Sequence, residues 1–260
     1  MIILTGIGGF IAKYVEKLLD GTVIHVTQDN CFEFLNTFSS WSDVKYIYHL
    51  GAISDTTCTD VKKIHKYNVE FTLDLFQKAI EYKIPIRYAS SASVYGNSYN
   101  KINPLNHYAI SKATIDLWVE DNIDKFEHIQ GLRFFNVYGN GEEHKLDQAS
   151  PISKFRKQIK EQGTISIFED SEFYYRDFIC VEDVADVMVN NKLGSGIYDL
   201  GTSKPISFST VAKLMQRKYG GDIKVIRFPN HLLGKYQTST KAKEVFQHSF
   251  KSVSEWLNQN

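Results

Sequence analysis

The sequence contains few cysteines, no excess of either charge and no long apolar segment. Its three cysteines, Cys31, Cys58 and Cys180, are scattered and form no C-x-x-C pair, which argues against a disulfide framework or a thiolate metal site. Basic and acidic residues number 30 each, so there is no electrostatic case for nucleic acid or an anionic membrane as the main partner. We therefore expect no metal, no nucleic acid and no membrane span.

The start of the chain shows no pattern of a targeting segment. Met1 is followed directly by the apolar run Ile2–Leu4, without the basic stretch and cleavage site of a signal peptide. Hydrophobic residues make up 43% and charged residues 23%, as in an ordinary globular protein. We predict a cytoplasmic protein with reduced thiols, long enough for one large α/β domain or such a domain with a smaller lobe.

A strand, a glycine turn and a helix open the chain. Ile2–Thr5 is short, apolar and rich in β-branched residues, as is typical of a strand buried on both faces of a parallel sheet. The run GIGG at residues 6–9 follows, and a helical pattern begins near Ala12. Gly6 would allow the turn, Gly9 would allow close approach of a pyrophosphate, and the first helical N–H groups would face its charge. The pattern predicts a dinucleotide site, but a plain strand-to-helix turn can look similar.

Four further segments with strand composition follow, at residues 22–27, 45–50, 86–91 and 129–134. The stretch between residues 30 and 43 has room for only one short helix. We predict an α/β fold: a Rossmann-type doubly wound parallel sheet, with its third strand shortened or missing, and a smaller C-terminal substrate lobe. The predicted NAD(P)-binding domain covers residues 1–145 and also receives strands near 177–181 and 196–200. The predicted lobe covers mainly residues 146–260.

The candidate catalytic residues are Tyr108, Lys112 and Ser91. A tyrosine and a lysine four residues apart share one helix face, and the ammonium group is expected to lower the tyrosine pKa toward neutrality. Ser91 falls at the carboxyl end of a predicted strand, where ligands bind in open α/β sheets. With 15 tyrosines in the chain the spacing alone is weak, and its position beside the strand ends is what favours a site.

Three other polar features carry competing interpretations. His49 alternates with apolar residues and favours a hydrogen-bonded core histidine over a catalyst. Asn68 interrupts the apolar face of a predicted helix at 61–82, where a solvated position and a cofactor contact are both open. The polar run at residues 141–145 is interpreted as a loop with solvated charges.

Several motifs resemble those of the extended short-chain dehydrogenase/reductase family of nucleotide-sugar-modifying enzymes. They are TGIGGFIA at the start, YASSASVYG around Ser91, YAISK around Tyr108 and GLRFFNVYG near residue 135. Within this family, the chain is most similar to the ADP-L-glycero-D-manno-heptose 6-epimerases, through HLGAISDTT, FNVYGNGEEHK, FEDSEFYYRDF, VEDVADV and FPNHLLGKYQ. The resemblance spans nearly the whole chain except residues 22–45, where this chain is shorter.

The resemblance implies a role for each matching residue. Catalysis would involve Tyr108, Lys112, Ser91 and Lys145. One tightly bound NADP or NAD per chain would be held by Gly6, Gly9, Phe10, Ile11, Asp29, Asn30, Gly51, Ala52, Ser54, Lys112 and Val137. A nucleotide-diphosphate sugar would be bound by Ser91, Asn136, Asp147, Phe168, Glu169, Ser171, Arg176 and Tyr236. The family also implies a homo-oligomer.

Lys145 decides between the functions that remain open. Epimerisation by transient oxidation presents both faces of a ketone to the same hydride, so two proton-handling groups, Tyr108 and Lys145, can serve the two orientations. A lysine in that role needs a pKa lowered by burial or by a neighbouring cation. The alternatives are another nucleotide-sugar 4-epimerase, dehydratase or reductase, and a non-catalytic NAD(P)-binding regulatory protein.

Overall fold

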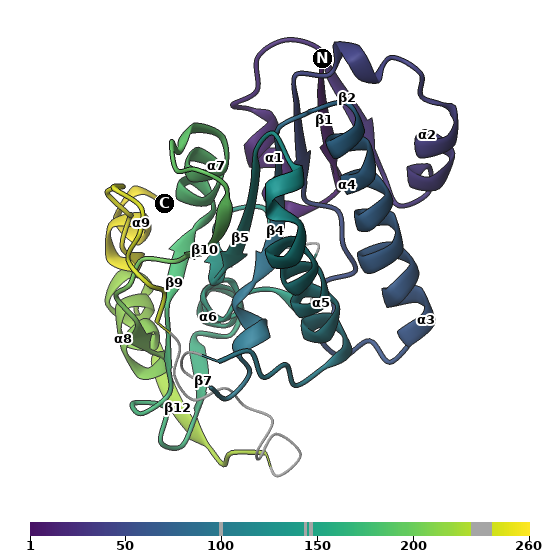
Figure 1. Ribbon diagram of the computed structural model, residues 1–260. Helices are drawn as coiled ribbons and strands as arrows, with labels where there is room; N and C mark the ends of the chain where they lie inside the picture. Colours follow the sequence, from purple (N-terminus) through teal and green to yellow (C-terminus); the bar gives the residue numbers. More distant parts are fainter. Residues whose placement is uncertain (99–100, 143–144, 146–147, 230–240) are drawn as a thin grey trace. The chain divides into compact units, whose positions relative to one another are not determined.

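The computed structural model describes residues 1–98, 101–142, 145, 148–229 and 241–260, and the chain divides into two compact units (Figure 1). Unit 1 comprises Met1–Gly96, Ile102–Phe134 and Ala185–Asp199. Unit 2 comprises Asn97–Lys101, Phe135–Val184 and Leu200–Asn260. Both units are therefore built from several separate pieces of chain.

Unit 1 is built on a six-stranded sheet with the order β10-β5-β4-β3-β1-β2. Its strands are β1 (Ile2–Thr5), β2 (Val23–Val26), β3 (Tyr46–His49), β4 (Ile86–Ser91), β5 (Ile129–Phe134) and β10 (Gly196–Leu200). The four pairs from β2 to β5 are parallel. The doubly wound fold is confirmed, and no strand lies between β2 and β3, a stretch that is described throughout, so the third strand is indeed missing.

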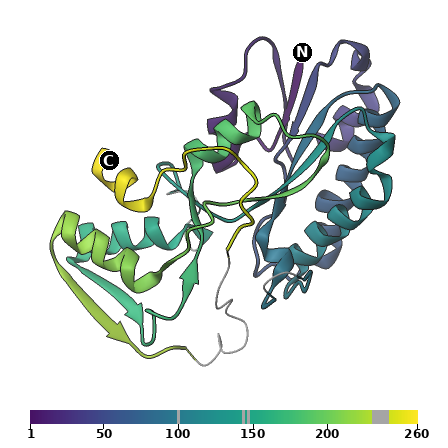
Figure 2. The same ribbon diagram turned by 60° about the vertical axis from the view of Figure 1, so that its left-hand side comes forward.

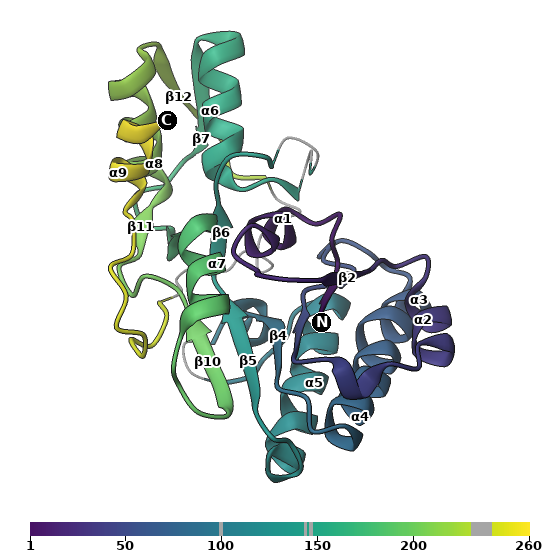
Figure 3. The same ribbon diagram turned by 90° about the horizontal axis from the view of Figure 1, so that it is seen from above.

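Helices cover both faces of this sheet. They are α1 (Phe10–Glu16), α2 (Cys31–Thr37), α3 (Val61–Ile64), α4 (Phe71–Glu81), α5 (His107–Asn122) and α7 (Val181–Asn190). Figure 1 shows α4 and α5 side by side against one face, and Figure 3 shows α1 and α7 on the other. The helix predicted at 61–82 is confirmed as one continuous helical run, in which a π-helical stretch, His65–Glu70, joins α3 to α4.

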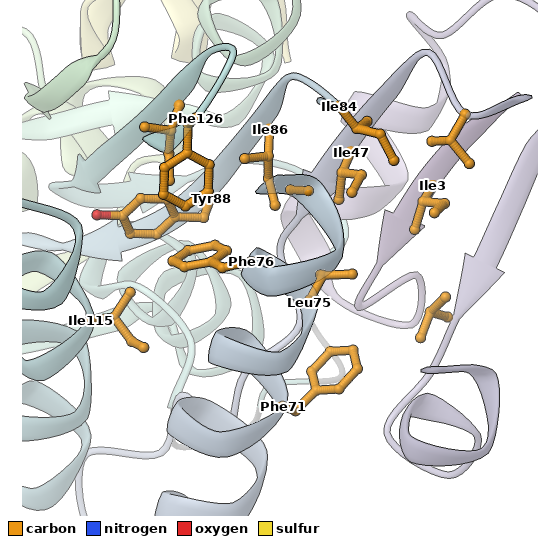
Figure 4. Packing of buried hydrophobic residues seen from close by; sticks show 14 of the residues in the cluster. Ile3, Ile47, Phe71, Leu75, Phe76, Ile84, Ile86, Tyr88, Ile115 and Phe126 are labelled. Atoms are coloured by element: carbon orange, nitrogen blue, oxygen red, sulfur yellow. The ribbon is translucent and has the colours of Figure 1, made fainter. Parts of the chain in front are cut away.

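The core of unit 1 lies between the sheet and the α4–α5 face (Figure 4). Leu75 and Phe76 of α4 and Ile86 of β4 are fully buried. The ring of Phe76 packs edge-on against that of Tyr88, with 5.3 Å between the ring centroids. Burying each such side chain stabilises the fold by about 2 kcal/mol, so this layer fixes the helices against the strands.

In the part of unit 2 that the structure describes, the strands form three two-stranded sheets. Its strands are β6 (Asn136–Tyr138) with β9 (Phe178–Cys180), β7 (Thr164–Phe168) with β12 (Asp222–Ile226), and β8 (Tyr175–Arg176) with β11 (Ile206–Ser207). Its helices are α6 (Pro151–Gln162), α8 (Phe208–Tyr219) and α9 (Val253–Gln259). Figure 2 shows α6 and α8 lying along β7 and β12. A second core, including Ile152, Met215 and Trp256, holds these elements together.

The strand expected near 177–181 lies outside the main sheet, in contrast to the one at 196–200. Directly after β5, Phe135 N donates to Leu200 O at 3.0 Å and Asn136 N donates to Asp177 O at 3.0 Å. The chain thus changes partner at Phe135, and the next residues form β6, which pairs with β9. None of the helices in the described part of the chain is long and apolar enough to cross a bilayer.

Candidate active site

The glycine turn after β1 has a geometry that only glycine can adopt. Gly6 has φ +75°, and a Cβ on it would lie 2.7 Å from Gly51 Cα in the neighbouring strand end. Gly9 N donates to Gly6 O at 2.8 Å, and Gly9 then forms the N-cap of α1. Gly8 and Gly9 are exposed, and a Cβ on Gly8 would meet nothing within 4 Å. The turn therefore presents bare backbone at the carboxyl end of β1, as a bound pyrophosphate requires.

The other predicted cofactor residues of unit 1 follow neighbouring strands. Asp29 is exposed three residues after β2. Asn30 Oδ1 instead accepts a hydrogen bond from Thr27 N at 2.8 Å, which fixes the turn leading into α2. Gly51 and Ala52 are half-buried and Ser54 is exposed after β3. The exposed backbone of Gly8 and Gly9 suits the pyrophosphate of a dinucleotide, and the exposed Asp29 carboxylate suits its adenosine ribose.

A directed set of hydrogen bonds holds Ser91 at Tyr108. Ser93 donates to Ser91 Oγ from its backbone N at 3.2 Å and from its Oγ at 2.8 Å. Since these donors occupy the lone pairs of Ser91 Oγ, its own proton is free to be given to the Tyr108 phenol, with which it is hydrogen-bonded. Asn106 Oδ1 caps α5 by accepting from Ala109 N at 2.8 Å, so the helix begins immediately before Tyr108.

Lys112 is buried on the same helix and donates from Nζ to Ala89 O of β4 at 2.7 Å. Burial lowers the Lys112 pKa to about 8, although the Asp116 carboxylate opposes that change. Burial raises the pKa of Tyr108; the Ser91 hydrogen bond acts in the opposite direction and Asp116 adds to the rise. We expected Lys112 to lower the Tyr108 pKa. In the protein alone the Tyr108 pKa is raised instead, because desolvation of the phenolate is the largest effect.

His49 and Asn68 belong to a buried network behind these residues. Asn68 is 2% exposed, so it is not a solvated position, and it makes both a donor and an acceptor contact with the Ile53 backbone. Its Nδ2 also donates to Ser111 Oγ at 3.0 Å, next to Lys112. The π-helical stretch places Asn68 at this point, which the helical periodicity of the sequence did not show.

The hydrogen bonds of His49 determine its tautomer. Thr72 Oγ1 donates to Asn68 O, so it must accept from His49 Nε2, which lies 2.8 Å away. Thr5 Oγ1 accepts from Gly51 N and is 2.7 Å from His49 Nδ1, to which it donates. Burial, followed by the nearby Lys112 charge, lowers the His49 pKa to about 3. The interpretation of His49 as a hydrogen-bonded core residue is confirmed.

Unit 2 contains Lys145 and most of the predicted substrate residues. Burial lowers the pKa of Lys145, with Glu142 acting in the opposite direction. The interpretation of this loop as solvated charges is wrong at Glu142, which is 1% exposed. Its carboxylate accepts from Gly139 N, from Ser150 N and Oγ, and from Ser153 Oγ. Four donors compensate the burial of Glu142, which thereby connects Gly139 to Ser150 and Ser153 at the start of α6.

The remaining substrate and cofactor predictions divide into those that the structure places and those that it does not describe. The placed residues all belong to unit 2: Asn136, Val137, Phe168, Glu169, Ser171 and Arg176. Arg176 is buried, donates to Tyr175 O and lies over the Phe208 ring. Ser171 is 3% exposed and accepts from Ser209 N through its carbonyl. Asp147 and Tyr236 lie outside the described residues.

Comparison with known proteins agrees with this geometry. The family model described as "NAD dependent epimerase/dehydratase family" matches residues 2–193. The chain belongs to this family, which confirms the predicted extended short-chain dehydrogenase/reductase class and an NAD-dependent epimerase-type enzyme. The match covers the glycine turn, Ser91, Tyr108 and Lys112.

More particularly, two curated relatives share a single enzyme name. The chain is 39% identical over 231 residues to the ADP-L-glycero-D-manno-heptose-6-epimerase of Brachyspira hyodysenteriae, covering 83% of this chain and 72% of that one. It is 34% identical, with the same coverage, to the enzyme of that name from Alkalilimnicola ehrlichii.

Solved structures support the fold. The Helicobacter pylori ADP-L-glycero-D-manno-heptose-6-epimerase has a TM-score of 0.79 at 24% identity, covering 93% of this chain and 86% of that chain. A UDP-N-acetylglucosamine 4-epimerase from Methanobrevibacter ruminantium has a TM-score of 0.82 at 19% identity, covering 99% and 96% respectively. Such likenesses extend over both units.

Proposed function

We propose that this enzyme inverts one carbinol centre of a nucleotide-diphosphate sugar, most closely as an ADP-L-glycero-D-manno-heptose 6-epimerase does. The observation that carries the proposal is the hydrogen-bonded Ser91–Tyr108 pair with buried Lys112 one turn further along α5. The names of two relatives, at 39% and 34% identity, support the choice of sugar.

Tyr108 acts as the proton-transfer group in this proposal. A bound nicotinamide would accept and return the hydride, and its cationic oxidised ring would favour the phenolate. Tyr108 takes the hydroxyl proton as the carbinol is oxidised in one orientation, and in the reverse reaction it returns the proton as the ketone is reduced in that same orientation. The Ser91 hydroxyl holds the phenol and the reacting oxygen together, and Lys112, whose Nζ donates to Ala89 O, would hold the nicotinamide ribose.

Lys145 is proposed as the second proton-handling group. Burial lowers its pKa, which brings a lysine closer to the range in which it can act as a base at neutral pH. The buried Glu142 carboxylate, which accepts four hydrogen bonds from Gly139, Ser150 and Ser153, acts on the Lys145 pKa in the opposite direction. A ketone presented in either orientation would then find one proton-transfer group.

We propose NAD as the cofactor, held at the glycine turn. Asp29 is the exposed carboxylate that follows β2, and it would accept hydrogen bonds from the adenosine ribose while repelling a 2′-phosphate. No arginine lies near it in the sequence to compensate that phosphate. Mass spectrometry of the nucleotide released from purified protein distinguishes NAD from NADP.

The test of the proposed function uses single turnover. ADP-heptose added to purified protein should transiently raise the absorbance of reduced nicotinamide and yield the 6-epimer, detected by NMR. Tyr108→Phe should abolish both signals while the nucleotide stays bound. Lys145→Met should slow epimerisation by about 100-fold, the size of a lost acid–base contribution, without preventing reduction of the cofactor.

The outcomes separate the functional alternatives. Reduction without epimer formation would indicate a dehydrogenase or reductase, and activity only with UDP-sugars would indicate a 4-epimerase. Absence of nucleotide binding and of any absorbance change with all nucleotide sugars would refute the proposal.

A further inference from the structure

A fully buried carboxylate lies one helical turn beyond Lys112. Asp116 of α5 has a relative exposure of 0%. Its Oδ1 accepts from Tyr88 Oη at 2.9 Å, and its Oδ2 accepts from Ser90 Oγ at 2.8 Å. The catalytic helix is thereby connected to two residues of β4, the strand that ends in Ser91.

The charge of Asp116 is balanced by the sheet. Arg133 of β5 donates from Nε to Asp116 Oδ2 at 2.7 Å, and its side chain is 12% exposed. Arg133 also donates to Tyr95 Oη, which in turn donates to Asp199 of β10. Because the pair is almost removed from water, its charges act over a longer range than surface charges do.

The sequence of β5 leaves room for this arrangement. Gly131 lies opposite Tyr88 in the parallel β4–β5 register. A Cβ on Gly131 would lie 2.3 Å from Tyr88 Oη, the atom that donates to Asp116. Any larger residue would displace that ring, so the glycine allows Tyr88 to reach the carboxylate.

We propose that Asp116 and Arg133 are positioning residues that set the electrostatic potential at both Tyr108 and Lys112. The Asp116 carboxylate makes this potential more negative, and the Arg133 guanidinium makes it more positive. The inference rests on the proposed function of that pair. Asp116 favours the protonated forms of both groups, and Arg133 disfavours them. Lys112, Asp116 and Arg133 therefore form a row in which positive and negative charges alternate, and this row begins one helical turn after Tyr108.

Other charged or titratable groups near this row lie on α5, β3, β4, the turn after β4 and β10. Glu120 of α5 lies 3.9 Å from Arg133 Nη2 but its side chain is 53% exposed. His49 of β3 is neutral at physiological pH. Tyr88, Tyr95 and Asp199 complete the set, from β4, the turn after β4 and β10. In the structure, Asp116 opposes the lowered pKa of Lys112 and adds to the raised pKa of Tyr108.

Two single variants test the sign of the effect. Asp116→Asn should move the Tyr108 ionisation and both limbs of the pH–kcat/KM profile to lower pH by about one unit. Arg133→Gln should move them to higher pH. The ionisation of Tyr108 is measured without substrate, as the pH dependence of phenolate absorbance. The absorbance of the same variant that also carries Tyr108→Phe is subtracted, so that only the Tyr108 signal remains. The substrate-free readout separates failure of this inference from failure of the proposed function.

Controls distinguish charge from packing. Asp116→Glu and Arg133→Lys keep the charges and should keep the wild-type profile at reduced kcat. Glu120→Gln makes the same charge change on the exposed side of the helix and should shift the profile by less than about 0.3 units. The double variant Asp116→Asn/Arg133→Gln removes the pair together and should return both limbs toward wild type.

Shifts in the same direction for the two single variants, or no shift in either, would overturn the proposal, because damage to packing lowers kcat without an opposite dependence on charge. If Asp116→Asn does not fold, Arg133→Gln compared with Arg133→Lys decides alone.

Discussion

The two units bury carboxylates in different ways. In unit 1, Asp116 of α5 is paired with a cation, Arg133, on the parallel strand β5. In unit 2, Asp177 is 0% exposed and binds loops: it accepts from Thr202 N and Oγ1, Ser203 N and Ala242 N. Glu142 likewise accepts from Ser150 N and Oγ, at the start of α6.

The difference follows from the size of the sheets. In unit 1 the six-stranded sheet provides hydrogen-bond partners for most backbone N–H groups of its strands. The Asp116 carboxylate therefore accepts from side chains instead of from loop backbone. The sheets of unit 2 have two strands each, and its connecting loops contain backbone N–H groups that need other acceptors. Carboxylates supply them, and unit 2 therefore depends on a few side chains more than unit 1 does.

The largest loss of stability is expected from Asp177→Asn. If unit 2 tolerated this substitution, the claim that its loops depend on buried carboxylates would be wrong. An amide offers one acceptor where four donors converge and places its own donors against them, so unfolding should become easier by about 4 kcal/mol. Urea denaturation measures this. Asp170→Asn, at an exposed turn with φ +60°, should change the stability by less than about 0.5 kcal/mol. Equal effects of the two variants would contradict the role of Asp177.

Glu142→Gln should cost about 3 kcal/mol by the same mechanism, and it also tests the catalytic proposal. Removing this carboxylate removes the opposing influence on Lys145, so the lysine pKa should fall further. The pH dependence of Lys145 acylation by a small reagent reports that shift. Glu161→Gln, on an exposed position of α6, serves as the control. An unchanged acylation profile would mean that Glu142 acts on the loop only.

His49 predicts an acid sensitivity that belongs to unit 1. Its folded pKa of about 3 lies below the unfolded value near 6.5, so the unfolded state binds the proton first as the pH falls. The stability is complete above pH 6.5 and should decrease by about 2 kcal/mol between pH 7 and pH 5. His49→Asn should remove this part of the pH dependence, whereas His65→Gln, at an exposed histidine, should leave it intact. Urea denaturation at the two pH values makes the comparison.

The smallest effect is expected from helix caps. Asn106→Ala should cost about 1 kcal/mol and lower kcat, because the first turn of α5 carries Tyr108. Ser252→Ala removes the cap of α9 in unit 2 and should cost a similar amount without changing kcat. Thermal denaturation and turnover measure the two effects. If kcat decreased equally in both variants, the loss would reflect general stability.

The sequence predicted the sheet of unit 1 better than the architecture of unit 2. β1, β4 and β5 are apolar runs bounded by turn residues, and the glycine turn and the YAISK segment have fixed spacings, so local pattern was sufficient. Asp177 was missed because its hydrogen bonds join residues 25 to 65 positions apart. Glu142 was missed although its partners lie only 3 to 11 positions away, because an acid in a polar run usually faces solvent. Asp116 was missed because a lone acid on a helix usually faces solvent. The role of Asp116 depends on its ion pair with Arg133, which is 17 residues away in the sequence and becomes visible only in the folded structure.

The position of β10 has a consequence for how the protein can be made. Residues Gly196–Leu200 complete the sheet beside β5, yet about 50 residues of unit 2 separate the two in the chain. During synthesis, five strands of the sheet leave the ribosome long before the sixth, and the edge of β5 stays open to other chains meanwhile. Pairing over that sequence separation is intrinsically slow. A nascent chain stalled before residue 196 should therefore be the species most prone to aggregate, and neither unit can be expressed as one uninterrupted fragment.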